Sequence, residues 1–228
     1  MTTHVFPSLI DDRDHTIASQ VSRQLRDAIL RGELHPAGRI NLARLGQELG
    51  VSGSPLREAL SRLIAENLVE FEDNRGYRVS EISRAKLAEI SLLRPEIEPI
   101  ALRHAIPAGK DKWDNRIIAA RHRLNSLRRH VTTSALDLHV AVLEVHRAFL
   151  SQCPLSHLVG FLGGLQNQHL RYLYASRDLA APSIEELDAV VAAVLDRDAD
   201  TACQKFKISL LTYGDAIDRS FSAGVLPE

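Results

Sequence analysis

Residues 50–80 read GVSGSPLREALSRLIAENLVEFEDNRGYRVS, and this stretch decides the fold of the first third of the chain. Gly50 suits the positive φ that closes a helix. Ser54 followed by Pro55 is typical of an N-cap with proline at the first helical position. Leucines and an isoleucine then recur at helical spacing, so the sequence predicts a helix over 55–67.

The segments on either side complete a recognisable set of elements. Downstream, LVEF (68–71) and YRVS (77–80) are typical of two short strands joined by the turn EDNRG (72–76), which predicts a hairpin. Upstream, apolar spacing predicts helices over 16–31 and about 42–49. Helix, turn, helix and two-stranded wing in this order indicate a device that reads a DNA groove.

In such a device the second helix of the pair enters the major groove with its N-terminal residues toward the bases. Arg57 lies in the first turn of that helix, where a guanidinium can bind guanine O6 and N7 together. Serines and free N–H groups at a helix start can bind a phosphate, and a wing tip can reach the adjacent minor groove. The predicted DNA-binding residues are Arg44, Ser52, Ser54, Arg57, Arg75 and Gly76.

Each of these residues also has a purely structural interpretation. Ser54 serves as an N-cap whether or not DNA is bound, and Arg57 can pair with Glu58 or another acid. Arg62, deeper in the helix, suits a solvated face. The order of the elements favours DNA binding more than any single residue does.

Composition places few further limits on function. The chain has 228 residues, 45% hydrophobic and 25% charged, which is ordinary for a soluble globular protein. Cys153 and Cys203 lie far apart and form no metal-binding pair, as expected in a reducing cytosol. Residues 1–14 are too polar for a signal peptide, and we expect a flexible leader there. No stretch approaches the length of a membrane helix, so we expect a cytoplasmic protein with no membrane partner.

Net charge argues mildly against a DNA-binding protein. The formal charge of the whole chain is −1, and residues 1–80 hold ten arginines, no lysine and eleven acids. Affinity for DNA would therefore depend on a few arginines placed on one face and on dimerisation.

Everything after about Arg84 is predicted to be helical. We expect helices over 84–105, 113–130, 133–151, 154–176, 183–196 and 198–223, with Pro95 and Pro99 kinking or splitting the first. The predicted fold class is therefore mainly α: a winged helix-turn-helix domain (15–80) and an antiparallel all-α bundle (84–226).

The first domain resembles the GntR family of bacterial regulators. The resemblance covers about 65 contiguous residues, including AILRGEL, PAGR, SPLREAL and the RG of the wing. It implies DNA contacts by Ser52, Ser54, Arg57 and Gly76. In that family the position after the first serine is usually arginine and touches DNA, but here it is Gly53, and the often polar or basic position 43 is Ala43. Each lost base contact costs about 1–3 kcal/mol.

The second domain resembles the FCD ligand domain of the FadR subfamily, through LLRPEIEPIALRHA (92–105), VHRAFLSQCPLSHLVGFL (145–162) and ELDAVVAAVLDRDADTACQKFKISL (186–210). Many FCD domains hold a divalent metal on one aspartate and three histidines. The matching positions here are Val142, His146, Leu187 and Ser209. One imidazole does not suffice for Zn²⁺, so we predict no metal or other cofactor.

A site built from other histidines stays open, because His139 lies seven residues before His146 and further histidines lie at 104, 122, 157 and 169. Without a metal, an effector needs direct anchors. Arginine and imidazole suit a carboxylate, so we expect an organic acid or another carboxylate. The predicted effector-binding residues are Arg94, His146, Gln166, His169 and Arg171. A salt bridge from Arg94 to Glu98, one turn later, is an equally weighted alternative.

These features together predict a regulator of transcription, more specifically a homodimeric repressor whose affinity for operator DNA is controlled by a small-molecule effector. Three alternatives remain open. One is a metal-dependent enzyme built on the helical bundle, although the sequence contains neither HExxH nor paired ExxH motifs. The second is a helical scaffold or DNA-binding protein that has lost its sensor. The third, raised by Gly53, is a binding module whose DNA-binding domain is vestigial.

Overall fold

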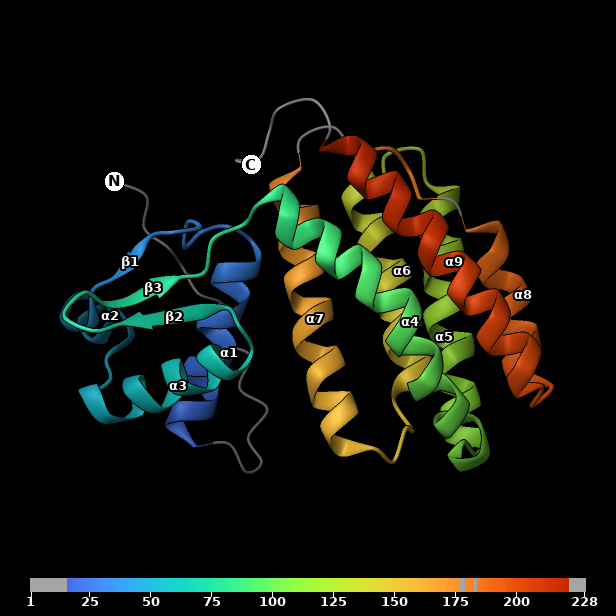
Figure 1. Cartoon of the computed structure of the whole chain (residues 1–228), viewed down its shortest axis with the longest axis horizontal. Helices are drawn as coiled ribbons and strands as arrows, with labels where there is room; N and C mark the ends of the chain where they lie inside the picture. The colour runs from blue at the N-terminus through green and yellow to red at the C-terminus, as the bar shows by residue number, and fades with distance from the viewer. Residues whose placement is uncertain (1–15, 177–178, 183, 222–228) are drawn as a thin grey trace. The chain divides into compact units, whose positions relative to one another are not determined.

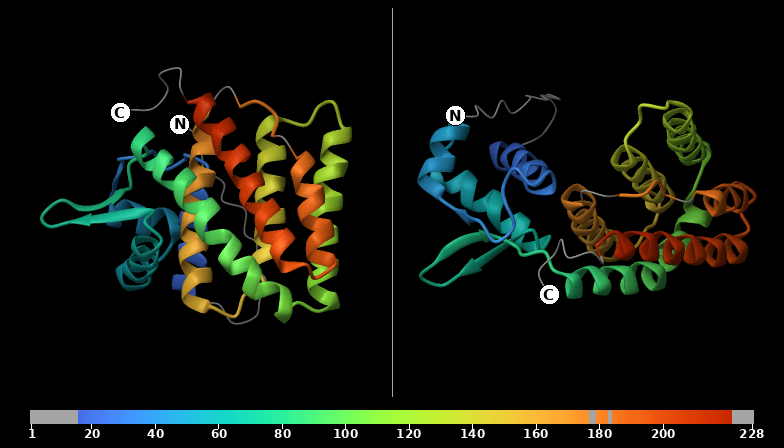
Figure 2. Two further views of the ribbon diagram at one scale, coloured as in Figure 1. Left: turned by 45° about the vertical axis from the view of Figure 1, so that its right-hand side comes forward. Right: turned by 90° about the horizontal axis from the view of Figure 1, so that it is seen from above.

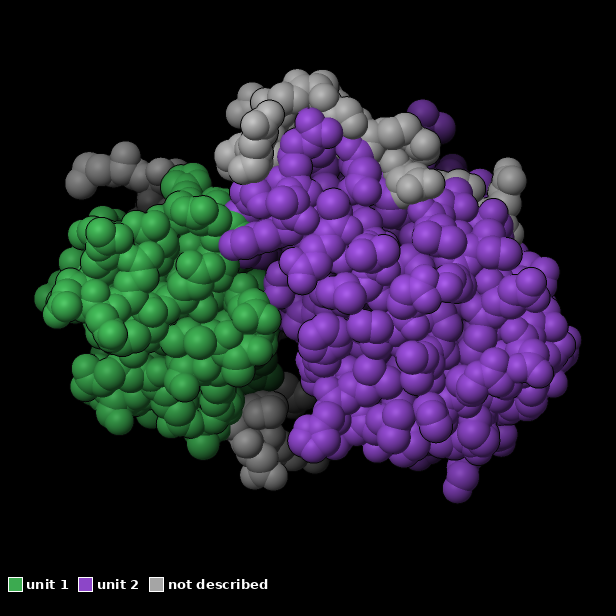
Figure 3. Space-filling view, viewed as in Figure 1, with its two compact units in different colours: residues 1–81 green, residues 82–228 purple. Residues whose placement is uncertain are grey.

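The computed structural model describes residues 16–176, 179–182 and 184–221. The expected leader at 1–14 lies outside these residues, as does the chain after 221. The chain divides into two compact units, residues 1–81 and 82–228, which Figure 3 shows in separate colours.

Unit 1 contains three helices and a small antiparallel sheet (Figure 1). The sheet has the strand order β1-β3-β2, and the β2–β3 hairpin pairs Phe71 with Tyr77 and Glu72 with Gly76. Figure 2 shows this hairpin extending away from the helices of unit 1, as a wing does. The elements are α1 (Ile17–Leu30), β1 (Arg39–Ile40), α2 (Leu42–Leu49), α3 (Gly53–Ala65), β2 (Val69–Glu72) and β3 (Gly76–Val79).

Local sequence explains where the first two helices begin and end. The side chains of Thr16 and Asn41 cap α1 and α2 by accepting hydrogen bonds from backbone N–H groups in the first turn. Gly50 closes α2 with a φ of +66°, which only glycine adopts without a steric penalty. The core of the unit is formed by fully buried leucines, among them Leu25, Leu56 and Leu60.

Helix α3 begins earlier than predicted. Its N-cap is Ser52, so the prediction that Ser54 caps the helix is wrong, and Ser54 and Pro55 both lie inside the first turn. Pro55 fits there because the first N–H groups of a helix have no partner within the helix. The shift places Ser52, Gly53 and Ser54 together at the exposed start of α3.

Unit 2 is entirely helical in its described part, and the predicted fold class is confirmed. Helices α4 and α9 pack along each other, α8 packs on α9, and α5 packs on α6 (Figure 1). None of the described helices is long and apolar enough to cross a membrane. The helices are α4 (Arg84–Ala108), α5 (Asp111–Arg129), α6 (Ala135–Leu150), α7 (Ser156–Ala175), α8 (Glu185–Leu195) and α9 (Ala199–Ser220).

Helix α4 is continuous, so the expectation that its prolines split it is wrong. Pro95 and Pro99 both lie inside the helix, and Pro95 is buried. Each proline removes one backbone donor. Burial of Leu87, Leu102 and Ile106 along the same helix favours the unbroken form despite that loss.

Candidate DNA interface and buried polar cluster

The start of α3 presents an exposed polar edge. Ser52, Ser54 and Arg57 are all exposed there. Among the described residues, the structure records no hydrogen bond or ion pair to the Arg57 guanidinium. The acid expected to compete for it, Glu58, instead accepts from Arg62 at 2.6 Å. The leading arginine of α3 is therefore available to a partner outside the chain.

The other predicted DNA-binding residues are exposed or half-buried but partly occupied. Arg44 donates to Glu48 at 2.7 Å within α2, and Arg75 donates to Glu72 at 3.2 Å at the wing tip. Both ion pairs are solvent-exposed and therefore weak, so either arginine can exchange its acid for a phosphate. Gly76 has a φ of +79°, which turns the wing into β3.

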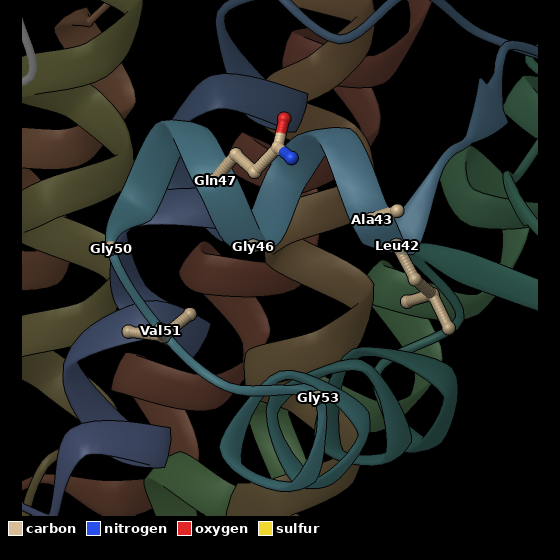
Figure 4. Close-up of a pocket in the computed structure, with 7 residues that line it drawn as sticks. All are labelled: Leu42, Ala43, Gly46, Gln47, Gly50, Val51 and Gly53. Atoms are coloured by element: carbon tan, nitrogen blue, oxygen red, sulfur yellow. The ribbon is translucent and has the colours of Figure 1, made fainter.

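An open depression of about 560 Å³ lies between α2 and the start of α3 (Figure 4). Ala43 and Gly53, the two departures from the GntR pattern, both contribute to its wall. A Cβ added at Gly53 would lie 3.4 Å from the Arg57 guanidinium, so that side chain folds back over the glycine. The lining residues are Leu42, Ala43, Gly46, Gln47, Gly50, Val51 and Gly53.

In unit 2, polar side chains from three helices meet in the core. Arg94 on α4 is 2% exposed, and His146 on α6 and His169 on α7 are 0% and 1% exposed. The Arg94 guanidinium bonds to Glu98 Oε1 at 2.5 Å, to His146 Nδ1 at 3.1 Å and to His169 Nδ1. The ion pair with Glu98, left open by the sequence, is therefore formed together with both imidazole contacts.

These contacts fix the protons of both rings. A guanidinium only donates, so both Nδ1 atoms accept and each neutral ring carries its proton on Nε2. Burial, reinforced by the charge of Arg94, lowers the pKa of His146 and of His169 well below 6.5, which keeps the rings neutral.

Several polar atoms of the cluster have no hydrogen-bond partner among the described residues. They are Glu98 Oε2, His146 Nε2, Gln166 Nε2 and His169 Nε2. Gln166 lies one turn before His169 on α7 and is 3% exposed. Buried polar groups without partners are costly, so their gathering in one core indicates a place for a polar ligand or for water.

Arg171 does not share a face of α7 with His169. Two residues after His169, it lies about 200° further around α7 and is buried on that other side. The role of Arg171 as an effector contact stays a prediction.

Sequence reasoning missed the aromatic member of the cluster, Tyr213 on α9. Its ring centroid lies 5.2, 5.8 and 5.5 Å from those of His139, His146 and His169. His139 Nε2 donates to the Ala180 carbonyl at 2.9 Å, so its Nδ1 accepts from the Tyr213 hydroxyl at 3.0 Å. Burial raises the pKa of Tyr213. In the sequence, the only signal for Tyr213 is the helical spacing of apolar residues along α9.

The residues at the FCD metal positions do not fit a metal. Val142, Leu187 and Ser209 are buried, and two of them offer no ligand atom. His146 accepts from Arg94 through Nδ1 and carries a proton on Nε2, so neither nitrogen has a free lone pair. The described residues contain no group of three or more histidine, cysteine or acidic side chains arranged to hold a metal ion.

Comparison with known proteins agrees with this architecture. Residues 17–79 match the model of bacterial regulatory proteins of the gntR family, and residues 89–208 match the FCD domain. The chain belongs to the GntR family of transcriptional regulators with an FCD domain, and it is a DNA-binding protein of that class.

Particular relatives span most of the chain. The HTH-type transcriptional repressor GlaR of Escherichia coli is 29% identical over 83% of this chain and 90% of its own. The uncharacterized HTH-type transcriptional regulator BphR of Paraburkholderia xenovorans is 30% identical over 82% of this chain and 80% of its own. The solved structure of E. coli McbR/YncC shares the fold with a TM-score of 0.74 at 19% identity, over 92% of this chain and all of that one.

Proposed function

We propose that this chain is a repressor of the FadR subfamily that acts as a homodimer in the cytoplasm and performs no catalysis. Unit 1 binds a two-fold symmetric operator. A small molecule bound in the polar cluster of unit 2, without a metal, lowers the affinity for that operator. The printed name of GlaR, a repressor similar to this chain over most of its length, supports the direction of control.

The observation that carries the DNA-binding part is the exposed start of α3, with the unpaired Arg57 on its leading edge. Arg57 is proposed to read bases, while Ser52, Ser54 and the first N–H groups of α3 bind a phosphate. Arg44 and Arg75 are proposed to hold the DNA backbone on either side. This proposal assigns one arginine to base readout and two arginines to positioning.

The effector part depends on the unpartnered donors of the cluster. The Nε2–H groups of His146 and His169 and the amide of Gln166 offer N–H donors in a fully buried core. A carboxylate is a suitable acceptor for such N–H donors. We propose an organic acid or another carboxylate as the effector.

The test of the DNA-binding part is a matched pair of α3 variants. Because one good base contact is worth about 1–3 kcal/mol, R57A is expected to weaken binding to the operator, selected from random DNA, by about tenfold or more. R62A is the control, since Arg62 lies on the same helix but already pairs with Glu58 of α3 and with Ser19 of α1. Equal affinities of R57A and the wild type would overturn the groove assignment.

The effector part is tested by native mass spectrometry of the purified protein and of His169→Ala. A bound organic acid that is present in the wild type, absent from the variant and able to release operator supports the proposal. If no acid in a metabolite extract of the host releases the operator, the result favours the alternative, a regulator that has lost its sensor.

A further inference from the structure

Four helices of unit 2 meet at one buried cation. Arg94 on α4 bonds to His146 on α6 and His169 on α7, and its guanidinium carbon lies 5.9 Å from the ring centroid of Tyr213 on α9. Glu98 supplies a single counter-charge at 2.5 Å. A buried cation that bonds to imidazoles from several helices links those helices, as a bound metal ion would.

This centre lies where the FCD metal positions converge. Val142 comes one turn before His146 on α6. Ser209 lies on α9 between Phe206 and Tyr213, whose ring centroids are 5.2 and 5.8 Å from that of His146. The arginine therefore reaches the one surviving metal-position histidine from within the same part of the core.

We propose that the Arg94 guanidinium replaces the divalent metal of this domain as a permanent, built-in cation. It links α4, α6 and α7, and Glu98 balances its charge. Because it occupies the lone pairs of both Nδ1 atoms, His146 and His169 act as N–H donors, and His146 is no longer free to bind a metal. A ligand in this core then meets N–H groups directly, with no metal ion between ligand and protein.

The first test is a titration of the full chain with Zn²⁺ and Ni²⁺ by isothermal calorimetry. We expect no one-to-one site that depends on His146. The control for weak surface binding is H157A, which removes an exposed histidine of α7. A stoichiometric site of micromolar Kd that H146A abolishes and H157A retains would overturn the proposal.

The second test removes the built-in cation and then restores a metal site. R94M/E98Q deletes the cation together with its counter-charge, so that no unpaired buried carboxylate remains. We expect this variant to melt at a lower temperature than the wild type and to gain nothing from Zn²⁺. Adding V142D, L187H and S209H to it is expected to create a site where a hundredfold excess of Zn²⁺ over Kd raises Tm by about 5 °C or more.

The outcomes separate cleanly. The proposal is overturned if R94M/E98Q is as stable as the wild type. It is also overturned if the five-site variant folds but its Tm does not change with Zn²⁺ or Ni²⁺. If circular dichroism shows that the five-site variant does not fold, the wild-type titration and the Tm of R94M/E98Q still decide the matter. None of these readouts uses operator or effector, so the proposed function and this inference fail separately.

Discussion

His146 and His169 are buried beside a cation, and burial together with that charge lowers the pKa of each imidazole well below 6.5. Burial also lowers the pKa of His139, although its hydrogen bond to Ala180 opposes the shift. Three neutral histidines around Tyr213 therefore make unit 2 sensitive to acid in a definite direction.

We predict that the free energy of unfolding is at its full value above about pH 6.5 and falls as the pH drops below it. The folded imidazoles resist protonation while the unfolded ones accept protons near 6.5, so each depressed histidine contributes a slope on the order of 1 kcal/mol per pH unit. Urea denaturation of the full chain at several pH values between 5 and 7 measures that slope.

The control for this prediction compares two variants of α7. H169Q removes a buried imidazole and is expected to flatten the slope by about one proton, whereas H157Q changes an exposed one. The same slope in both variants would contradict the proposed origin of the acid sensitivity.

At the level of elements, the turn between α2 and α3 depends on a close backbone approach. The Val51 N–H donates to the Gly46 carbonyl at 3.0 Å, and a Cβ added at Gly46 would lie 3.0 Å from the Val51 carbonyl oxygen. Two backbone segments meet there, so neither can yield as a flexible side chain would.

We predict that G46A lowers the free energy of unfolding of unit 1 by about 1–3 kcal/mol, because the added methyl group overpacks this contact. G53A is the matched control in the same unit. Its new Cβ would meet only the mobile end of Arg57, so it is expected to raise stability by about 0.5 kcal/mol. Chemical denaturation followed by circular dichroism measures both changes, and a loss in G53A as large as that in G46A would refute this interpretation.

Elements were predictable where periodicity is strong. Helix α2 runs over Leu42–Leu49, as its leucine spacing predicts, and the hairpin follows from its strand-turn-strand pattern. Strand β1 has only two residues, Arg39 and Ile40, too few to produce any pattern. The start of α3 was misplaced because Ser52 and Ser54 are equally good caps, and packing decides between them.

At the scale of the whole molecule, the sequence predicts a domain boundary at about 80–84, because only helices are expected after the hairpin. The clustering of His146 and His169 with Glu98 and Tyr213 was not predictable in this way. Arg94 and His169 lie 75 positions apart, and only tertiary packing brings the members of this cluster together. The resemblance to FCD domains pointed to Arg94 and His146, but it did not reveal that one binds the other.

Two-fold symmetry supplies the prediction at this scale. We expect sedimentation equilibrium to give twice the chain mass of 25.3 kDa. Scrambling one half of a palindromic operator is expected to weaken binding on the order of a hundredfold, because the second contact is intramolecular once the first has formed. A monomer in solution, or equal affinity for intact and half-scrambled operator, would refute the homodimer.

The arginine-only charge of residues 1–80 has a practical consequence at the bench. All the lysines of the chain lie at position 86 or beyond. Apart from the amino terminus, amine-reactive dyes, biotin esters and sensor-chip chemistry will therefore attach to the helical half. Tethering through primary amines leaves the leading edge of α3 chemically intact, so labelled protein remains suitable for quantitative work on nucleic-acid affinity.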